Sequence, residues 1–344
     1  MASSIKSWFK NHITTDNLYY AIKISIGIVL SILIAEFLNI DFAPSTGVVT
    51  LLGIESTRRG SLYTARHRGI SFLYTLLICY LVHDGIGTST KAFALAISFV
   101  VIISIFLGWF HTLSVNTVVA FHLFIMAEPF TIHLIVNEAL RVLIGVTIAL
   151  MLSWLIHPKI NKNMAAVNSV DESISQLLFT FCKILKREAP LNEDIPSRLE
   201  HLQHLIEDGS DLAFRYYNNV LEEHARFFID YMNMRGSELE LLKHIHQQIS
   251  HMDIQNNPAS ADALASLMEE MAPTISLKYS VKLWADSYQE TASVLDSTKL
   301  PGTRAEFLSQ ATAYYILQDL SEMIRLKHML VSSLSKEQKE RYLS

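Results

Sequence analysis

The residues with the clearest chemical potential in this 344-residue chain are a few charges set among long apolar runs. Arg66 and Arg68 directly precede an apolar run that begins at Gly69, and Arg141 lies inside another that continues to Ile156. A guanidinium presents a planar fork of donors that matches a carboxylate. A charge at membrane depth costs about 2.5–3.5 kcal/mol or more, and usually marks a pathway or a binding site. Arg141 inside its span, and Arg66 and Arg68 at the entrance to theirs, are therefore candidate contacts for an anion; for Arg66 and Arg68 the alternative is the ordinary excess of basic residues in a cytoplasmic loop.

Small polar residues open two short apolar segments, and they are the next candidates for substrate binding. Ser45 and Thr46 begin one segment, and Asn116 stands near the start of the other. Helix N-termini carry free N–H groups that attract anions. Ordinary helix capping is the alternative role for the same residues.

A second group of charges is predicted to surround the mouth of such a site. Arg58 and Arg59 would concentrate anions at an entrance, although they could equally contact lipid phosphates. Lys23 lies about one turn inside the first apolar run. Glu138 precedes Arg141 by three residues, so the two side chains share a helix face and can pair. The alternative is a salt bridge at a helix end, with Arg141 extending to the interface.

Enzymatic chemistry is not predicted. The sequence holds no H-E-x-x-H motif, no glycine-rich phosphate loop and no nucleophile elbow, so we expect no catalytic residue, no cofactor and no metal site. The two cysteines, Cys79 and Cys182, give neither a disulfide framework nor zinc spacing. His122, inside an apolar segment, could relay protons near neutral pH.

The elements that would position these residues divide the chain in two. Residues 1–159 hold ten Lys and Arg against seven Asp and Glu, whereas residues 160–344 hold eighteen against twenty-six. The apolar first half predicts a transmembrane domain over residues 1–158. The acidic second half, residues 159–344, lacks the basic face that nucleic-acid binding needs.

The first half is predicted to cross the membrane six times. A spanning helix needs about 20 apolar residues, and the order of lengths is long, short, long in each half of the domain. Short, interrupted segments at matching positions of two halves favour a transport site between them. The two short segments could instead be re-entrant or interfacial. The predicted spans are 18–38, 43–57, 67–83, 92–110, 114–128 and 137–156.

Lysine and arginine in the short loops predict the orientation, because cytoplasmic loops carry the excess of basic residues. With six spans, all basic loops fall on one side if both termini are cytoplasmic. We therefore expect a multi-pass protein of the cell membrane, in contact with membrane lipids.

The second half is predicted to be a cytosolic antiparallel bundle of six to eight helices, which makes the whole chain all-α. Apolar residues recur at helical spacing, and no segment alternates as a strand would. One long helix is expected to include residues 212–229. Breaks are expected at each Xaa-Pro pair, namely Ala189-Pro190, Ile195-Pro196, Asn257-Pro258, Ala272-Pro273 and Leu300-Pro301.

Two stretches carry a resemblance to a known family. The segment after the second predicted span reads STRRGSLYTARHRG, and the sixth span reads ALRVLIGVTIALMLSWLIHP with Arg141 four residues before Gly145. The chain resembles the bacterial aromatic acid exporter family, of the fusaric-acid-resistance-like superfamily that includes the plant aluminium-activated malate channels. The resemblance implies an organic-anion exporter or channel, a homodimer, and basic residues on the third and sixth spans that hold the anion. The matching positions are Arg66 or Arg68, and Arg141.

Two functions follow as hypotheses. The first is a membrane transporter or channel that exports organic anions, aromatic or carboxylic acids, through a path lined by arginines. The second is a membrane-anchored sensor or interaction protein that acts through its cytosolic bundle. The environment of Arg66, Arg68 and Arg141 separates the two, because a transport path requires these side chains to face protein rather than lipid.

Overall fold

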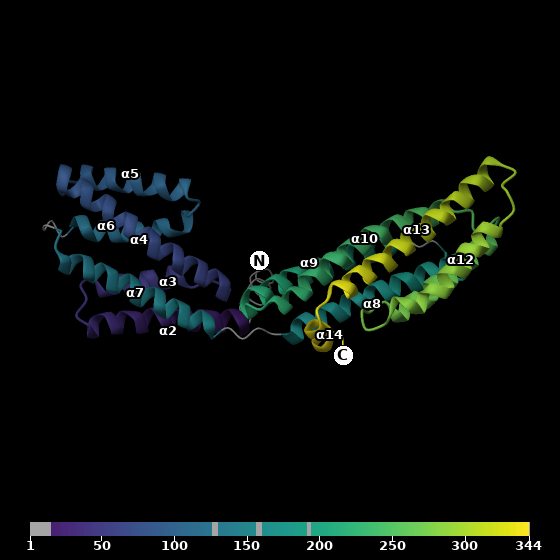
Figure 1. Cartoon of the computed structure of the whole chain (residues 1–344), viewed down its shortest axis with the longest axis horizontal. Coiled ribbons are helices and arrows are strands. Elements are labelled where there is room, and N and C mark those ends of the chain that lie inside the picture. The colour runs from purple at the N-terminus through teal and green to yellow at the C-terminus, as the bar shows by residue number, and fades with distance from the viewer. Residues whose placement is uncertain (1–14, 126–129, 156–159, 191–193, 344) are drawn as a thin grey trace, which may run out of the picture. The chain divides into compact units, whose positions relative to one another are not determined.

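A computed structural model of the chain describes residues 15–125, 130–155, 160–190 and 194–343. Across these ranges the secondary structure is helical, with no strand. The chain forms two compact units, Met1–His157 and Pro158–Ser344 (Figure 1). The prediction of an all-α protein is confirmed.

The first unit contains six α-helices within the described residues. They are α2 (Thr15–Phe37), α3 (Ala43–Gly53), α4 (Arg58–Ile86), α5 (Thr90–Phe106), α6 (Leu113–Ile125) and α7 (Ile132–Trp154), with a 3₁₀ turn, η1 (Phe110–Thr112), before α6. Three stretches are long and apolar enough to cross a membrane: Leu18–Phe37 of α2, and the helices α4 and α7. The helices α3, α5 and α6 are apolar but shorter.

The helix bounds differ from the predicted spans at several places: α7 begins at Ile132 rather than at residue 137, and α5 ends at Phe106 rather than at residue 110. We expected the second span to continue to residue 57, but α3 ends at Gly53. We also expected Arg58 to Arg66 to precede the third span, whereas α4 already begins at Arg58. The Thr57 hydroxyl accepts a hydrogen bond from the Gly60 N–H and caps α4 at that point. The predicted ends of the fifth and sixth spans, at residues 128 and 156, lie outside the described residues.

The two short helices lie among the longer ones. The helix α3 packs against α2 and α7, while α6 packs against α5 and α4. In the same way α2 contacts α7, and α5 contacts α4. The two triplets α2–α3–α4 and α5–α6–α7 therefore have the same pattern of contacts, with α2 corresponding to α5, α3 to α6 and α4 to α7. The 11 residues of α3 make a helix only about 16 Å long, so it could not cross about 30 Å of hydrocarbon by itself.

Glycines allow α3 to approach its neighbours closely. A Cβ atom on Gly145 of α7 would lie 2.6 Å from Cγ1 of Val49 and 3.2 Å from the Thr46 carbonyl oxygen. A Cβ on Gly47 of α3 would lie 2.9 Å from Cδ1 of Ile32. Small residues at such contacts are typical of helix packing in membranes.

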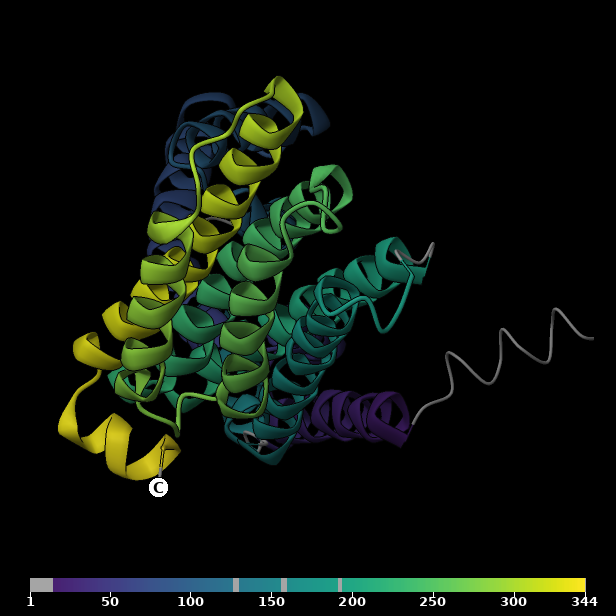
Figure 2. The ribbon, with the colours of Figure 1, turned by 90° about the vertical axis from the view of Figure 1, so that its right-hand side faces the viewer.

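The second unit is a bundle of helices that run alongside one another (Figure 2). Its α-helices are α8 (Ile160–Leu185), α9 (Asp194–Val220), α10 (Phe227–His251), α11 (Pro258–Met271), α12 (Ala285–Ser297), α13 (Arg304–Ser333) and α14 (Lys336–Tyr342). Short 3₁₀ segments η2 (Glu223–Arg226), η3 (Ala272–Thr274) and η4 (Val281–Trp284) join some of them.

One predicted helix of this unit was wrong. We expected a continuous helix over residues 212–229, but α9 ends at Val220 and α10 begins at Phe227. Leu221 has a φ of 64°, in the left-handed region, which stops the helix. The apolar spacing continues across this turn, so periodicity alone did not reveal it.

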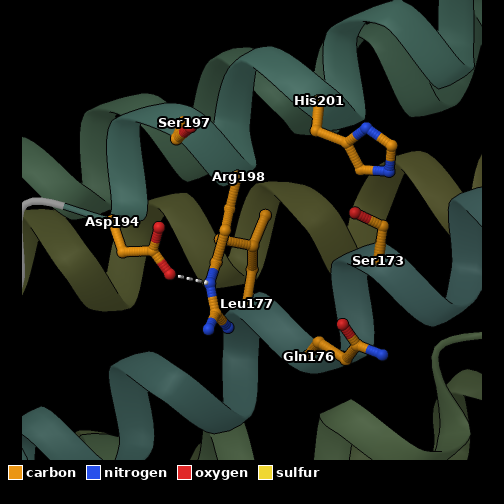
Figure 3. Close-up of a pocket in the computed structure, with 7 residues that line it drawn as sticks. All are labelled: Ser173, Gln176, Leu177, Asp194, Ser197, Arg198 and His201. Atoms are coloured by element: carbon orange, nitrogen blue, oxygen red, sulfur yellow. Dashed lines mark hydrogen bonds and ion pairs between the residues drawn. The ribbon is translucent and has the colours of Figure 1, made fainter.

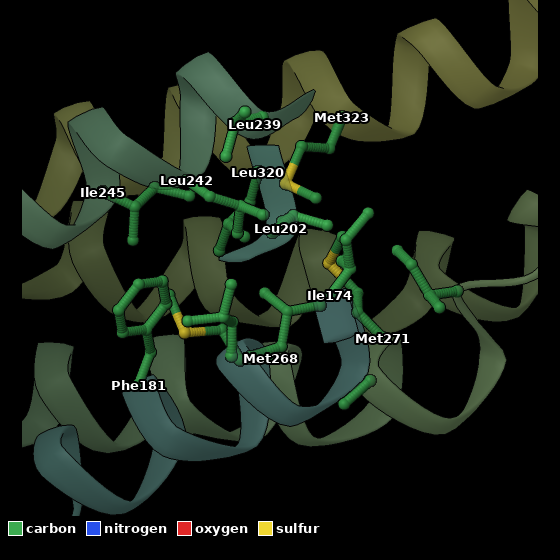
Figure 4. Packing of buried hydrophobic residues seen from close by; sticks show 14 of the residues in the cluster. Ile174, Phe181, Leu202, Leu239, Leu242, Ile245, Met268, Met271, Leu320 and Met323 are labelled. Atoms are coloured by element: carbon green, nitrogen blue, oxygen red, sulfur yellow. The ribbon is translucent and has the colours of Figure 1, made fainter. Parts of the chain in front are cut away.

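A single apolar core holds the bundle together. Figure 4 shows Ile174 and Phe181 of α8 packed with residues of α9, α10, α11 and α13. Leu202, Leu242 and Leu320 are fully buried there. Burial of each such side chain stabilises the fold by about 1.5–3 kcal/mol.

Candidate functional site

Arg141 of α7 stands at the centre of a buried polar cluster. Only 1% of the residue is exposed. Its Nη1 donates to Oε1 of Glu138 at 2.5 Å, and its Nη2 donates to the carbonyl oxygen of Asp41 at 2.6 Å. The predicted pairing of Glu138 with Arg141 is therefore confirmed, and the pair lies inside the helix packing rather than at an interface.

His122 of α6 joins this cluster to α3. Its Nδ1 contacts Arg141 Nη1 and lies 3.3 Å from Oε1 of Glu138, while its Nε2 lies 3.1 Å from the Ser45 hydroxyl. Toward Arg141, whose guanidinium can only donate, Nδ1 is on the acceptor side. The ring is thus fixed between two helices.

Phe42 covers the imidazole. Its ring stacks on His122 with the centroids 4.6 Å apart and an interplanar angle of 12°. The Arg141 guanidinium carbon lies 5.5 Å from the centroid of the same phenyl ring. Phe42 has a φ of 55° and a ψ of 38°, a left-handed conformation that a bulky residue rarely adopts.

Arg68 of α4 lies in a second buried place, against the C-terminal end of α3. Its Nη1 donates to the Val49 carbonyl at 3.0 Å, and its Nη2 donates to the Leu52 carbonyl. Carbonyls at a helix C-terminus carry partial negative charge and favour a cation. The cleft between Arg68 and α7 is too tight to hold a water molecule. A Cβ on Gly53 would come within 2.9 Å of Arg68 Nη1.

Asn116 and Thr46 occupy the fourth positions of α6 and α3. The Asn116 side chain accepts from the Ser71 hydroxyl at 3.1 Å, and its amide nitrogen donates to Thr112 at 3.3 Å. Ser71 also bonds the Arg68 carbonyl, so Asn116 is joined to the turn that carries this arginine. The Thr46 hydroxyl is buried and has no hydrogen-bond partner among the described residues.

The predicted mouth residues have mixed environments. Arg66 is exposed, whereas Arg58 and Arg59 are half-buried. Arg58 donates from Nη2 to the Trp154 carbonyl at 2.8 Å. Lys23 of α2 is only 6% exposed, and its ammonium has no acceptor within the described part of the chain.

Five of the predicted residues thus lie in two separate buried clusters. Arg141, Glu138 and Ser45 come together through His122, while Arg68 and Asn116 come together through Ser71. Sequence reasoning missed Asp41 and Phe42, since a left-handed turn before α3 leaves no pattern in the residue types. A usable pattern existed for Arg68, because the small and polar residues of α4 recur at helical spacing on its buried face: Ser61, Thr64, Arg68, Ser71 and Thr75.

The second unit has a buried ionic cluster of its own. Arg235 of α10 donates to Oδ1 of Asp171 at 2.6 Å and to Glu238. Lys327 of α13 donates to the Thr274 carbonyl at 2.8 Å, and its ammonium lies 4.1 Å from the Trp284 ring centroid. Burial, with the nearby Arg235 charge, lowers the pKa of Lys327 to about 7. Burial raises the pKa of Glu238.

A groove of about 240 Å³ lies between α8 and α9 of the second unit. Figure 3 shows Arg198 turned toward Asp194, with an Nε–Oδ2 distance of 3.2 Å, and His201 beside Ser173. Arg198, His201 and Gln176 are all exposed, so water solvates the groove. Among the described residues, no group of three or more His, Cys, Asp or Glu side chains could hold a metal ion.

Comparisons with known proteins cover both units. Residues 18–156 match the family profile "Aromatic acid exporter family member 1", and residues 161–328 match "Putative aromatic acid exporter C-terminal domain". The uncharacterized protein YqjA of Bacillus subtilis (strain 168) is 23% identical over 314 residues, which span 90% of this chain and 94% of the relative. A crystal structure titled "putative membrane protein from Clostridium difficile 630" aligns with a TM-score of 0.43 and 19% identity, over 51% of this chain and 99% of that one.

Proposed function

This chain belongs to the aromatic acid exporter family and is an integral membrane protein. On that premise we propose that it exports organic anions, which are aromatic or carboxylic acids. The path of the anion includes contacts with Arg68 and Arg141. The path follows the short helices α3 and α6. The bundle of residues 159–344 is its cytosolic domain, and the protein works as a homodimer, as the family resemblance implies.

The observation that carries this proposal is the placement of two buried arginines. Arg68 is the eleventh residue of α4, and Arg141 is the tenth residue of α7. Each belongs to the third helix of its triplet, and each lies near the C-terminal end of a short helix, α3 for Arg68 and α6 for Arg141. Arg68 and Arg141 therefore occupy corresponding positions in the two triplets of helices.

Both arginines hold partners that an anion can replace. In this structure the guanidinium groups bind backbone carbonyls and Glu138. At Arg68, a substrate carboxylate offers charged acceptors to the fork, which makes a stronger interaction than the neutral carbonyls do; at Arg141 it would compete with the Glu138 carboxylate. Two such sites at different depths of one path would pass an anion from one to the other.

The remaining basic residues suit the cytoplasmic end of the path. Arg58, Arg59 and the exposed Arg66 gather anions at the cytoplasmic mouth. Lys23, whose ammonium has no acceptor among the described residues, supplies a further cation on α2. Six spans with both termini in the cytoplasm place these basic residues on the side that positive charge favours.

The proposal is tested by anion efflux from proteoliposomes that contain the full chain. We expect benzoate or malate to leave faster than from protein-free liposomes. Arg68→Ala should slow this efflux about tenfold or more, because the lost charged hydrogen bonds are worth about 1.5–3 kcal/mol. Lys91→Ala, at an exposed lysine of α5, should leave it unchanged. If wild-type protein moves neither anion, a membrane-anchored sensor or interaction protein becomes the better description.

A further inference from the structure

We infer that the second unit contains a binding site for a small neutral phenol, and that the Tyr342 side chain of α14 occupies this site in the structure. The helix α14 is then the cover of the site, and a phenol binds when α14 moves away. The site belongs to the second unit and not to the transport path, so the inference goes beyond the proposed function and does not depend on it.

Tyr342 lies in a seat of aromatic rings at the start of α10. Its ring stacks on Phe227, with the centroids 4.5 Å apart and an interplanar angle of 8°. The ring of Phe228 meets it edge to face at 5.0 Å, and the His224 ring lies 6.1 Å away. Aromatic pairs favour these geometries beyond the area that they bury. The aromatic seat of Phe227, Phe228 and His224 therefore suits a flat ring better than an aliphatic group of the same size.

The aromatic seat is held in place independently of α14. Phe227, Phe228 and His224 are each at most 6% exposed. Tyr231, whose ring lies 5.9 Å from that of Phe227, donates to Asp171 of the buried ionic cluster. Because this cluster anchors the rings from behind, the seat keeps its shape when Tyr342 leaves.

The cover is a short helix with one anchor. The seven residues of α14 are fewer than the roughly 12–15 that an isolated helix needs to be stable in water. Tyr342 is the one residue of α14 that is buried. Gln338 Nε2 lies 3.4 Å from the His224 carbonyl oxygen, and Glu337 Oε1 lies 3.7 Å from His224 Nδ1, both long contacts. A ligand in the aromatic seat therefore competes directly with the docking of α14.

The neighbourhood of the Tyr342 ring favours an uncharged ligand. Burial raises the pKa of Tyr342, so its hydroxyl stays protonated in the seat. A small cleft continues beside the ring and is lined in part by the apolar Met164, Val167 and Leu277. A charged ring would lose its hydration there. The free molecule p-cresol reproduces the tyrosine side chain, so it is the simplest probe of the site.

Direct binding tests the site. Equilibrium dialysis measures labelled p-cresol on the full chain in detergent, with protein-free micelles as the background. Tyr342→Ala empties the seat, and we expect it to lower the dissociation constant about tenfold or more, because the wild-type site is open only while α14 is away. Tyr315→Ala, at an exposed tyrosine of α13, should bind as wild type does. Methylcyclohexanol has a similar shape without the aromatic ring and should compete about two- to tenfold less well.

Limited digestion with trypsin tests the cover in the wild-type chain, where no variant can disturb the fold. Lys336, Lys339 and Arg341 of α14 are exposed and are trypsin sites, but a docked helix resists cleavage. We expect saturating p-cresol to speed cleavage in α14 several-fold. In Tyr342→Ala the cleavage should be fast with or without p-cresol.

Two results would overturn the inference. One is a dissociation constant in Tyr342→Ala that is equal to or above the wild-type value. The other is wild-type cleavage that saturating p-cresol leaves unchanged. Neither assay measures transport, so either result leaves the transport proposal standing, and a failure of anion efflux leaves the phenol site standing.

Discussion

Two arginines that are two residues apart, Arg66 and Arg68, have opposite environments. On a helix they point about 200° apart, so only one can face the interior, and Arg68 is 2% exposed while Arg66 is exposed. Both arginines were candidates from the sequence, because the segment up to residue 66 was expected to be a loop. The buried stripe of Thr64, Ser71 and Thr75 selects Arg68, once α4 is known to begin at Arg58.

At the same scale, the Glu138–Arg141 pair was predictable, since three residues on one helix determine it. The meeting of Ser45 with His122 was not, because 77 residues separate them. Their contact depends on how α3 packs against α6, which no local pattern encodes.

The buried Lys327 leads to a stability prediction. Its pKa is about 7 in the fold and about 10.4 in an unfolded chain. Between these values the unfolded chain binds one more proton, so the unfolding free energy of the bundle should rise with pH.

Lys327→Met imitates the neutral form and should raise the thermal midpoint at pH 7. It should also lack the rise between pH 7 and 10. Scanning calorimetry of the full chain in detergent measures both. Lys336→Met, at an exposed side chain of α14, is the control. A midpoint lowered by Lys327→Met would show that the ammonium stabilises the fold instead.

At the scale of helices, the approach of α3 to α7 depends on Gly145. A methyl group there would meet Val49 and the Thr46 carbonyl, and the backbone oxygen cannot rotate away. Gly145→Ala should destabilise the first unit by about 1–3 kcal/mol through overpacking, seen as a lower thermal midpoint in detergent.

Gly69→Ala is the matched control, since a Cβ at Gly69 has nothing within 4 Å. It should leave the midpoint unchanged or raise it slightly, because alanine favours a helix. Equal midpoints for the two alanine variants would contradict the account of α3 packing. The presence of short helices was predictable from hydropathy, whereas their close partners were not, since small residues occur in lipid-facing and protein-facing positions alike.

For the whole molecule, the orientation makes a direct prediction. The proposed six spans would put the connection between α4 and α5 outside the cell and the second unit inside. A cysteine at exposed Thr88 should react with an impermeant maleimide in intact cells. A cysteine at exposed Ser333 should react only after the membrane is opened.

The native Cys79 and Cys182 are buried, and the same protein without either new cysteine gives the background. Labelling of both positions from one side would exclude the proposed topology. The boundary between the two compact units coincides with a change in charge and hydropathy along the sequence. The turn at Leu221 was not predictable, since the apolar spacing runs through it.

The measurement that tests the central claim most directly is organic-anion efflux with the charges of the Arg141 cluster removed together. Glu138→Gln with Arg141→Gln leaves no unpaired buried charge, so the fold should survive, as gel filtration and the thermal midpoint would show. We predict at least a tenfold loss of benzoate and malate efflux in this double variant, and an intermediate loss in Arg141→Lys, which keeps the charge without the fork. Wild-type efflux from the folded double variant would contradict the proposed path through Arg141.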